Sequence, residues 1–356
     1  MFRKPKSWLA LLLALGASLA QAQDAPAPAA SAGAITNLQT VTVSGVQPGP
    51  GLWKVSRGGH TLWVLGLIRT LPERMQWRSG EVAEVIAQSQ EVLEPPSVQV
   101  KADTNFLGKL FLLPSVYSAR KNEDGKTLDQ VLPSALYARW QPLKQQYLGN
   151  GRGVERWRPI FAAMELYKKA LRQHGLRGNG EIGGTVDALA KQHGVKQTLT
   201  QYQLVIEKPR QAIKAFKQAG PDDVACFGRT LDSIEHDLPA ITERANAWAT
   251  GDLATLRRLP DSRYRDACVE ALTGAGFARE LGISDVPARV EAGWLAAAER
   301  ALAANTTTFA MLPMDSVLDA GGYLAKLKAK GYTVLAPDED EGDAEDAPAA
   351  AGSTAR

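Results

Sequence analysis

Two charged side chains follow apolar runs that are typical of buried strands. Arg69 comes after residues 62–65, a run that stops at Gly66, and Glu94 ends residues 90–94 just before two prolines. In open α/β sheets, ligands bind outside the carboxyl ends of the strands. If the two strands are neighbours, Arg69 and Glu94 lie side by side. A guanidinium beside a carboxylate forms an ion pair that can be bidentate.

The first of these runs belongs to a predicted β-hairpin. Residues 52–55 form its first strand, residues 57–60 turn, and residues 62–65 run back. Consecutive glycines in the turn supply the positive φ that a tight hairpin needs. The return strand is apolar on both faces, so it is expected inside a sheet, with strands on either side.

The second run follows a predicted helix. Residues 79–89 place Val82, Val85 and Ile86 on one face of a helix, at the spacing of an amphipathic element. Residues 90–94 then form a short strand that the following prolines end. The order strand, helix, strand is typical of a parallel crossover.

The rest of the chain is mostly helical until its last strands. Helices are predicted at 134–147, 158–173, 186–194, 209–217, 221–251, 253–259, 285–304 and 323–330, and strands at 38–44, 198–202, 306–312 and 332–336. This pattern predicts an α/β fold of α+β-like character. Its small central sheet, mixed or parallel, is built from both chain ends, and a large helical part is inserted between them.

The two ends of the chain do not resemble folded segments. Residues 1–22 combine basic residues, an apolar core and Ala20-Gln21-Ala22, the pattern of a cleaved signal peptide. Residues 23–50 are expected to be a disordered linker with a short strand, 51–336 a single domain and 337–356 an acidic disordered tail. We therefore expect a periplasmic or secreted protein with no membrane span after cleavage; a leader kept as an anchor is the alternative.

The charge balance bears on the partner. The chain has a net charge of +3, and its leader carries three basic residues and no acidic one, so cleavage leaves a neutral chain. Seven acidic residues lie between 338 and 346, which leaves the body mildly basic without a concentrated stripe. This distribution argues against nucleic acid as a partner.

The chain has two cysteines, Cys226 and Cys268. An even pair in an oxidising compartment is a disulfide candidate, and closing a loop of this length would stabilise the fold by roughly 4 kcal/mol on the chain-entropy model. Two buried thiols are the alternative. Neither cysteine has a cysteine or histidine partner at the spacing of a metal site.

The hairpin and the residues after it also carry a family resemblance. A tryptophan-bearing hairpin, an apolar strand, then Gly-x-x-His and Leu-Pro resembles the opening of the TraB/GumN family, which includes the Tiki-type metal-dependent peptidases. Residues 66–72 read Gly-Leu-Ile-Arg-Thr-Leu-Pro here. Residues 184–187 are similar to a helix start of the family, residues 247–252 to a helix end, and residues 322–334 to its closing helix and strand. The resemblance covers residues 51–336.

The resemblance implies a metal site that this chain does not complete. In the Tiki-type members two Gly-x-x-His motifs and a glutamate hold a divalent metal, which activates a water for attack on a peptide bond. Glu94 matches the glutamate, but Arg69 stands at the first histidine and Ser316 at the second. Arginine has no free lone pair for a metal. Asp315 or Asp319 would offer a replacement oxygen.

A further carboxylate, Asp187, has two readings: it serves the start of its helix, or it faces the site. We expect a catalytically degenerate protein that needs no cofactor and binds a peptide, a glycan or an envelope protein. The alternative is a hydrolase with a rearranged site of Glu94, Asp187 and Asp315 that uses Mn, Co or Zn. A third hypothesis makes the chain a structural partner of an envelope complex that docks through its acidic tail.

Overall fold

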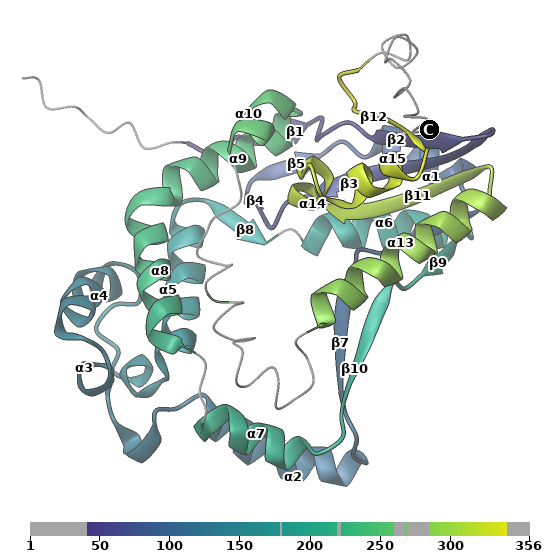
Figure 1. Cartoon of the computed structure of the whole chain (residues 1–356). Coiled ribbons are helices and arrows are strands. Elements are labelled where there is room, and N and C mark those ends of the chain that lie inside the picture. The colour runs from purple at the N-terminus through teal and green to yellow at the C-terminus, as the bar shows by residue number, and fades with distance from the viewer. Residues whose placement is uncertain (1–40, 179, 219–221, 260–267, 269–284, 340–356) are drawn as a thin grey trace, which may run out of the picture. The chain divides into compact units, whose positions relative to one another are not determined.

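The predicted hairpin lies at the centre of a six-stranded sheet (Figure 1). The computed structural model describes residues 41–178, 180–218, 222–259, 268 and 285–339. The strand order is β12 (Thr333–Leu335), β2 (Trp53–Arg57), β3 (His60–Leu67), β11 (Thr307–Pro313), β6 (Glu91–Leu93) and β9 (Lys196–Thr198). The last four strands run parallel, whereas β2 is antiparallel to both of its neighbours. The sheet is thus built from both chain ends, which confirms the predicted fold class.

The hairpin turns at two glycines, as the sequence predicts. Gly58 and Gly59 have φ of +61° and +86°, a region that side chains with a Cβ rarely occupy. They connect Arg57 directly to His60 across the two antiparallel strands. β3 then lies between β2 and β11, which covers both of its edges. Its apolar character on both faces is therefore explained by burial.

The crossover differs from the simplest expectation. The helix α1 (Gly80–Gln88) connects β3 to β6 as predicted, and both strands are parallel to β11. However, β11 from the C-terminal part of the chain lies between them. Because adjacent strands are about 4.8 Å apart, β3 and β6 are separated by about 10 Å.

Within the described part of the chain, three two-stranded sheets accompany the central one. They pair β1 (Gly45–Gln47) with β5 (Met75–Trp77), β4 (Thr70–Pro72) with β8 (Leu176–Gly178), and β7 (Ser97–Ala102) with β10 (Gln201–Ile206). The strand expected at 38–44 is not found in its described part, residues 41–44. Instead, the side chain of Asn246 forms hydrogen bonds with this backbone: it accepts from the N–H of Val43 and donates to the carbonyl of Val41.

Helices from both halves of the chain pack on the sheet. They are α1, α6 (Gly180–Gln192), α13 (Val286–Ala304), α14 (Met314–Leu318) and α15 (Tyr323–Ala329). The fully buried Trp294 of α13 meets Tyr323 edge-on, with ring centroids 5.2 Å apart. This packing ties the long α13 helix to the short helix that precedes β12.

The helical middle has a core of its own. Its elements are η1 (Glu123–Gly125), α3 (Leu128–Val131), α4 (Ser134–Tyr147), η2 (Gly153–Arg156), α5 (Pro159–Gln173), α8 (Asp223–Asp232), η3 (Ser233–Asp237), α9 (Leu238–Thr250) and α10 (Leu253–Arg258). Trp140 and Phe227 are both fully buried and lie 5.3 Å apart between their centroids. The helical segment predicted at 221–251 consists of three consecutive elements: α8, the π-helical turn η3, and α9.

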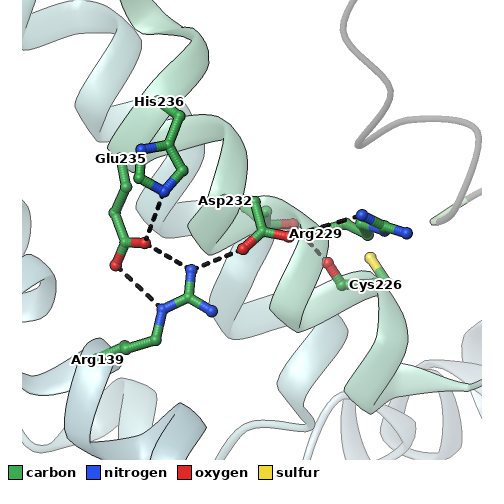
Figure 2. A network of polar contacts seen from close by, with 7 residues as sticks. Arg139, Cys226, Arg229, Asp232, Glu235 and His236 are labelled. Atoms are coloured by element: carbon green, nitrogen blue, oxygen red, sulfur yellow. Dashed lines mark hydrogen bonds and ion pairs between the residues drawn. The ribbon is translucent and has the colours of Figure 1, made fainter.

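That π-helical turn carries a polar network (Figure 2). Arg139 of α4 donates to Asp232 at 2.7 Å and to Glu235 at 2.5 Å and 3.3 Å. His236 lies 3.8 Å from Glu235, and Arg229 lies 3.8 Å from Asp232. One guanidinium thus joins α4 to the end of α8 and to the turn itself.

Cys226 of α8 forms a disulfide with Cys268, which confirms the predicted pairing. The predicted signal peptide, the linker before residue 41 and the tail after residue 339 lie outside the described residues. Where the tail is described, Asp338 forms a bidentate ion pair with Arg257, with distances of 2.5 Å and 2.8 Å. Among the described helices, none combines the length and the apolar character that crossing a membrane requires.

No element was predicted within residues 97–127, and residues 97–119 form part of an extension beside β6 and β9. β7 follows β6 and β10 follows β9, so the parallel pairing of β6 with β9 continues as a two-stranded ribbon. Beyond the ribbon, α2 (Phe106–Ala119) follows β7 and α7 (Pro209–Gln218) follows β10, and these two helices pack together (Figure 1).

Candidate functional site

The carboxyl ends of four parallel strands place the candidate residues at one edge of the central sheet. Arg69 follows β3, Asp315 follows β11, Glu94 follows β6 and Thr200 follows β9. Sequence reasoning placed the site at this edge, and the strand order now fixes which residues are neighbours. Asp315 follows β11, and β11 lies between β3, which precedes Arg69, and β6, which precedes Glu94.

The backbone of Glu94 is fixed to the neighbouring strand. Its N–H donates to the carbonyl of Thr198 at 3.0 Å, and its own carbonyl accepts from the hydroxyl of Thr200 at 2.8 Å. These bonds hold Glu94 where β6 ends, before Pro95 and Pro96 redirect the chain. The position of its carboxyl is therefore set by the sheet.

The carboxyl of Glu94 faces that of Asp187. Burial raises the pKa of Glu94 to about 7, and the negative charge of Asp187 and a hydrogen bond with it act in the same direction. A carboxyl beside a negatively charged carboxylate keeps its proton to a higher pH. We call Glu94 and Asp187 the carboxyl dyad.

Asp187 reaches the dyad from the second half of α6. That helix begins at Gly180, so the expectation that Asp187 serves a helix start is wrong. The glycines at 183 and 184, which suggested a start, are inside the helix. The side chain of Gln197 on β9 donates to the carbonyl of Asp187 at 3.2 Å, which ties this part of α6 to the sheet edge. The alternative interpretation, that Asp187 is an acidic group facing the site, agrees with the structure.

Arg69 is not among the groups that shift the pKa of Glu94, so the expected ion pair between these two residues has no support. The reason is the strand order, because β11 separates the two strands that carry them. The Arg69 side chain is exposed in the short connection between β3 and β4. A guanidinium against Glu94 would also lower the pKa of this carboxyl, whereas the observed environment raises it.

The second motif position is occupied by packing and by an ion pair. Met314 is fully buried and would collide with any Cβ added at Gly66, since its Cε and Sδ lie 2.6 Å and 2.8 Å from that point. Asp315 forms an ion pair with Arg244, a buried side chain of α9. The same guanidinium donates to the carbonyl of Leu256 at 3.1 Å and to that of Leu259.

The divalent metal that the family resemblance implies does not fit these donors. Arg69 offers no lone pair, Asp315 is already neutralised by Arg244, and Asp319 accepts from the N–H of Gly321 at 2.6 Å. Within the part of the chain that the structure describes, no three His, Cys, Asp or Glu side chains are grouped to hold a metal ion. Glu94 and Asp187 supply two carboxyls only.

Arg244 is the residue of this edge that sequence reasoning missed. It lies on α9 in the segment just before Trp248, whose indole N–H donates to the carbonyl of Gly66 at 2.7 Å. The available signal was the helix end that resembles the family's. Gly251, with φ of +77°, ends α9, and Asp252 caps α10 by accepting from the N–H of Thr255 at 3.0 Å. This corner brings α9 against the end of β3.

A comparison with known protein families agrees with the resemblance that the sequence motifs suggest. A sequence model of the TraB/PrgY/gumN family matches residues 51–336, which is most of the chain. No curated protein and no solved structure matches the chain. The matched span contains the hairpin, the carboxyl dyad and the closing helix and strand. The chain therefore belongs to the TraB/PrgY/gumN family.

Proposed function

We propose that this chain is an exported, catalytically degenerate member of its family that binds a peptide, a glycan or an envelope protein at the carboxyl edge of the sheet. The observation that carries the proposal is the replacement at Arg69. A permanently charged guanidinium stands where the family pattern has a neutral imidazole, and it cannot ligate a metal.

The neighbouring positions support the same conclusion. Near the second motif, Asp315 is paired with the Arg244 guanidinium, whose positive charge would repel a divalent ion, and Asp319 accepts from a backbone N–H. The remaining pair is Glu94 and Asp187, and Glu94, with a pKa of about 7, holds a proton up to near-neutral pH. A metal would have to displace that proton without the help of an imidazole.

The same residues offer recognition chemistry. With Glu94 protonated, the carboxyl dyad presents both a hydrogen-bond donor and acceptors, and Arg69 adds a cation at the same edge of the sheet. Hydroxyl groups of a glycan and the amides of a peptide bind to such a mixture of donors and acceptors. This mixture favours a polar ligand over an apolar one.

Export is part of the proposal. The leader-like N-terminus motivates it, and the disulfide between Cys226 and Cys268 supports it, because disulfides persist mainly in oxidising compartments. Fractionation of the producing cells, with detection of the chain in the periplasm or the medium, tests this part separately.

Binding can be tested on an array of peptides and envelope glycans. We expect a ligand whose affinity falls about tenfold in Glu94→Gln, because one partner of the dyad is removed. Glu84→Gln, which changes an exposed glutamate of α1, serves as the matched control and keeps the affinity. Metal-stimulated cleavage of any arrayed peptide that Glu94→Gln abolishes would contradict the proposal.

A second function rests on the dyad itself. A carboxyl with a pKa of about 7 beside another carboxyl is suited to general acid–base work in a hydrolase without a metal. Such an enzyme would cleave a peptide or glycan with a rate that depends on pH around neutrality, and Asp187→Asn would displace that dependence toward lower pH. A pH-independent rate would exclude it.

A further inference from the structure

The helix α2 exposes an unusually apolar surface. Of the α2 side chains that the structure describes, Leu112 and Ala119 are buried, whereas Phe111 is 69%, Tyr117 64% and Leu113 58% exposed. At 3.6 residues per turn, the exposed apolar side chains extend around more than half of the helix circumference. They are Leu110, Phe111, Leu113, Val116 and Tyr117. A contiguous patch of this kind marks an interaction surface.

The neighbouring helix α7 adds positive charge. Lys217 of α7 donates to the hydroxyl of Ser118 at 2.6 Å, which fixes the two helices side by side. Lys208, Arg210 and Lys214 are exposed on or just before α7. The sequences of α2 and α7 contain no acidic residue; the nearest ones along the chain are Asp103 and Glu207, where the ribbon ends.

A hollow lies where the ribbon meets the two helices. It has a volume of about 340 Å³, and Thr104, Leu112, Lys208 and Arg210 line it together with Asp103. Pro209 and Gln211 at the start of α7 also line it, so the positive end of the helix dipole lies beside the two cationic side chains. This combination is suited to a phosphate group beside an apolar chain.

We propose that the tip formed by α2 and α7 binds the surface of a lipid bilayer that contains anionic headgroups. Aromatic and aliphatic side chains next to Lys and Arg are the composition of helices that lie in a membrane interface. Charge complementarity to anionic lipids favours this occupant. A protein partner is less well matched, because lysine is depleted in protein–protein interfaces.

In this arrangement α2 lies in the interface with Phe111, Leu113 and Tyr117 between the acyl chains. Lys208, Arg210 and Lys214 contact the headgroups. The β7–β10 ribbon then connects the bilayer surface to the sheet that carries the carboxyl dyad. The proposal concerns surface binding and requires no membrane-spanning helix.

Vesicle flotation with the purified chain tests this proposal. We expect flotation with vesicles of phosphatidylcholine and phosphatidylglycerol, and little with phosphatidylcholine alone. Replacing Phe111, Leu113 and Tyr117 together by serine should lower the bound fraction at least about tenfold. Lys208→Gln with Lys214→Gln should lower binding to anionic vesicles by about tenfold and make it less sensitive to salt.

Two control variants match these changes elsewhere on the surface. Met164→Ser with Val46→Ser removes exposed apolar side chains, and Lys191→Gln with Lys328→Gln removes exposed cations. Both should float as the original chain does. Circular dichroism melting of every variant separates lost binding from lost folding.

The proposal is overturned if the chain does not float with anionic vesicles or if the tip and control variants behave alike. It is also overturned if sedimentation shows a dimer that the serine variant dissociates while flotation is absent. That result would identify the surface as a contact between copies of this chain.

Discussion

At the scale of single residues, the environment of Glu94 links the site to pH. Its pKa is about 7 in the folded chain against an ordinary value of 4.5, so the folded state binds this proton more tightly than the unfolded state. The contribution of Glu94 to stability is therefore complete below about pH 4.5 and is lost as the pH rises to about 7. Above that pH the two carboxylates repel each other.

Glu94→Gln should remove this dependence. The amide cannot ionise, so we expect the variant to be more stable than the original chain at pH 8 by about 1–2 kcal/mol, after allowance for partial exposure to solvent. Urea unfolding at pH 5 and pH 8 measures the difference. An equal difference between the two proteins at both pH values would mean that Glu94 is not protonated near neutrality.

The buried Arg244 is the second residue with a measurable role. Arg244→Met leaves Asp315 and the carbonyls of Leu256 and Leu259 without their donor, so we expect a loss of about 3 kcal/mol. Arg258→Met removes an exposed ion pair with Glu243 and should cost less than about 1 kcal/mol. Chemical unfolding of both variants tests this ranking, and equal losses would contradict the assigned role of Arg244.

At the scale of elements, the turn between α14 and α15 depends on one close backbone approach. A Cβ at Gly322 would lie 2.2 Å from the carbonyl oxygen of Ser316, which is backbone and cannot rotate away. A Cβ at Gly321 would meet its nearest neighbour, the Asp319 carboxylate, at 3.5 Å. Two adjacent glycines thus differ in the space around them.

Gly322→Ala should therefore destabilise the chain by about 2 kcal/mol or more, because the turn has to move. Gly321→Ala, the matched control, should change stability by less than about 0.5 kcal/mol. Thermal unfolding of the two variants tests the prediction. Similar melting temperatures would show that the turn adjusts without cost.

Local elements were largely predictable from sequence, and their neighbours were not. The hairpin with Gly58 and Gly59, the helix at 80–88 and the short strand before Pro95 follow from patterns over a few residues. The position of β11 between β3 and β6 depends on pairing between strands more than 200 residues apart. Local periodicity contains no information about such pairing. The ribbon of β7 and β10 was missed for the same reason.

The site shows the same division. Glu94 was identified by its place at a strand end, but its partner was assigned to Arg69 when the true neighbour is Asp187. The prediction that Arg69 lies beside Glu94 assumed that strands consecutive in the sequence also pair in the sheet, and here they do not. Asp187 was retained as an alternative, since a carboxylate on a helix can face the sheet, yet the helix start that sequence suggested lay several residues too late.

At the scale of the whole molecule, the disulfide cross-links positions 42 residues apart. On the chain-entropy model, replacing Cys226 and Cys268 by alanine should lower the free energy of unfolding by roughly 4 kcal/mol. Guanidinium unfolding measures the loss, and adding a reductant to the original chain should reproduce it. Unchanged stability in both cases would mean that the bond does not form in the isolated protein.

Our proposal that the chain is catalytically degenerate depends on Arg69 and the carboxyl dyad standing in place of a metal site at the carboxyl edge of the sheet. The most direct test is elemental analysis of the purified chain after incubation with manganese, cobalt or zinc and gel filtration. We predict far less than one equivalent of any of these metals. One equivalent that the chain retains, and that Glu94→Gln loses, would contradict the account.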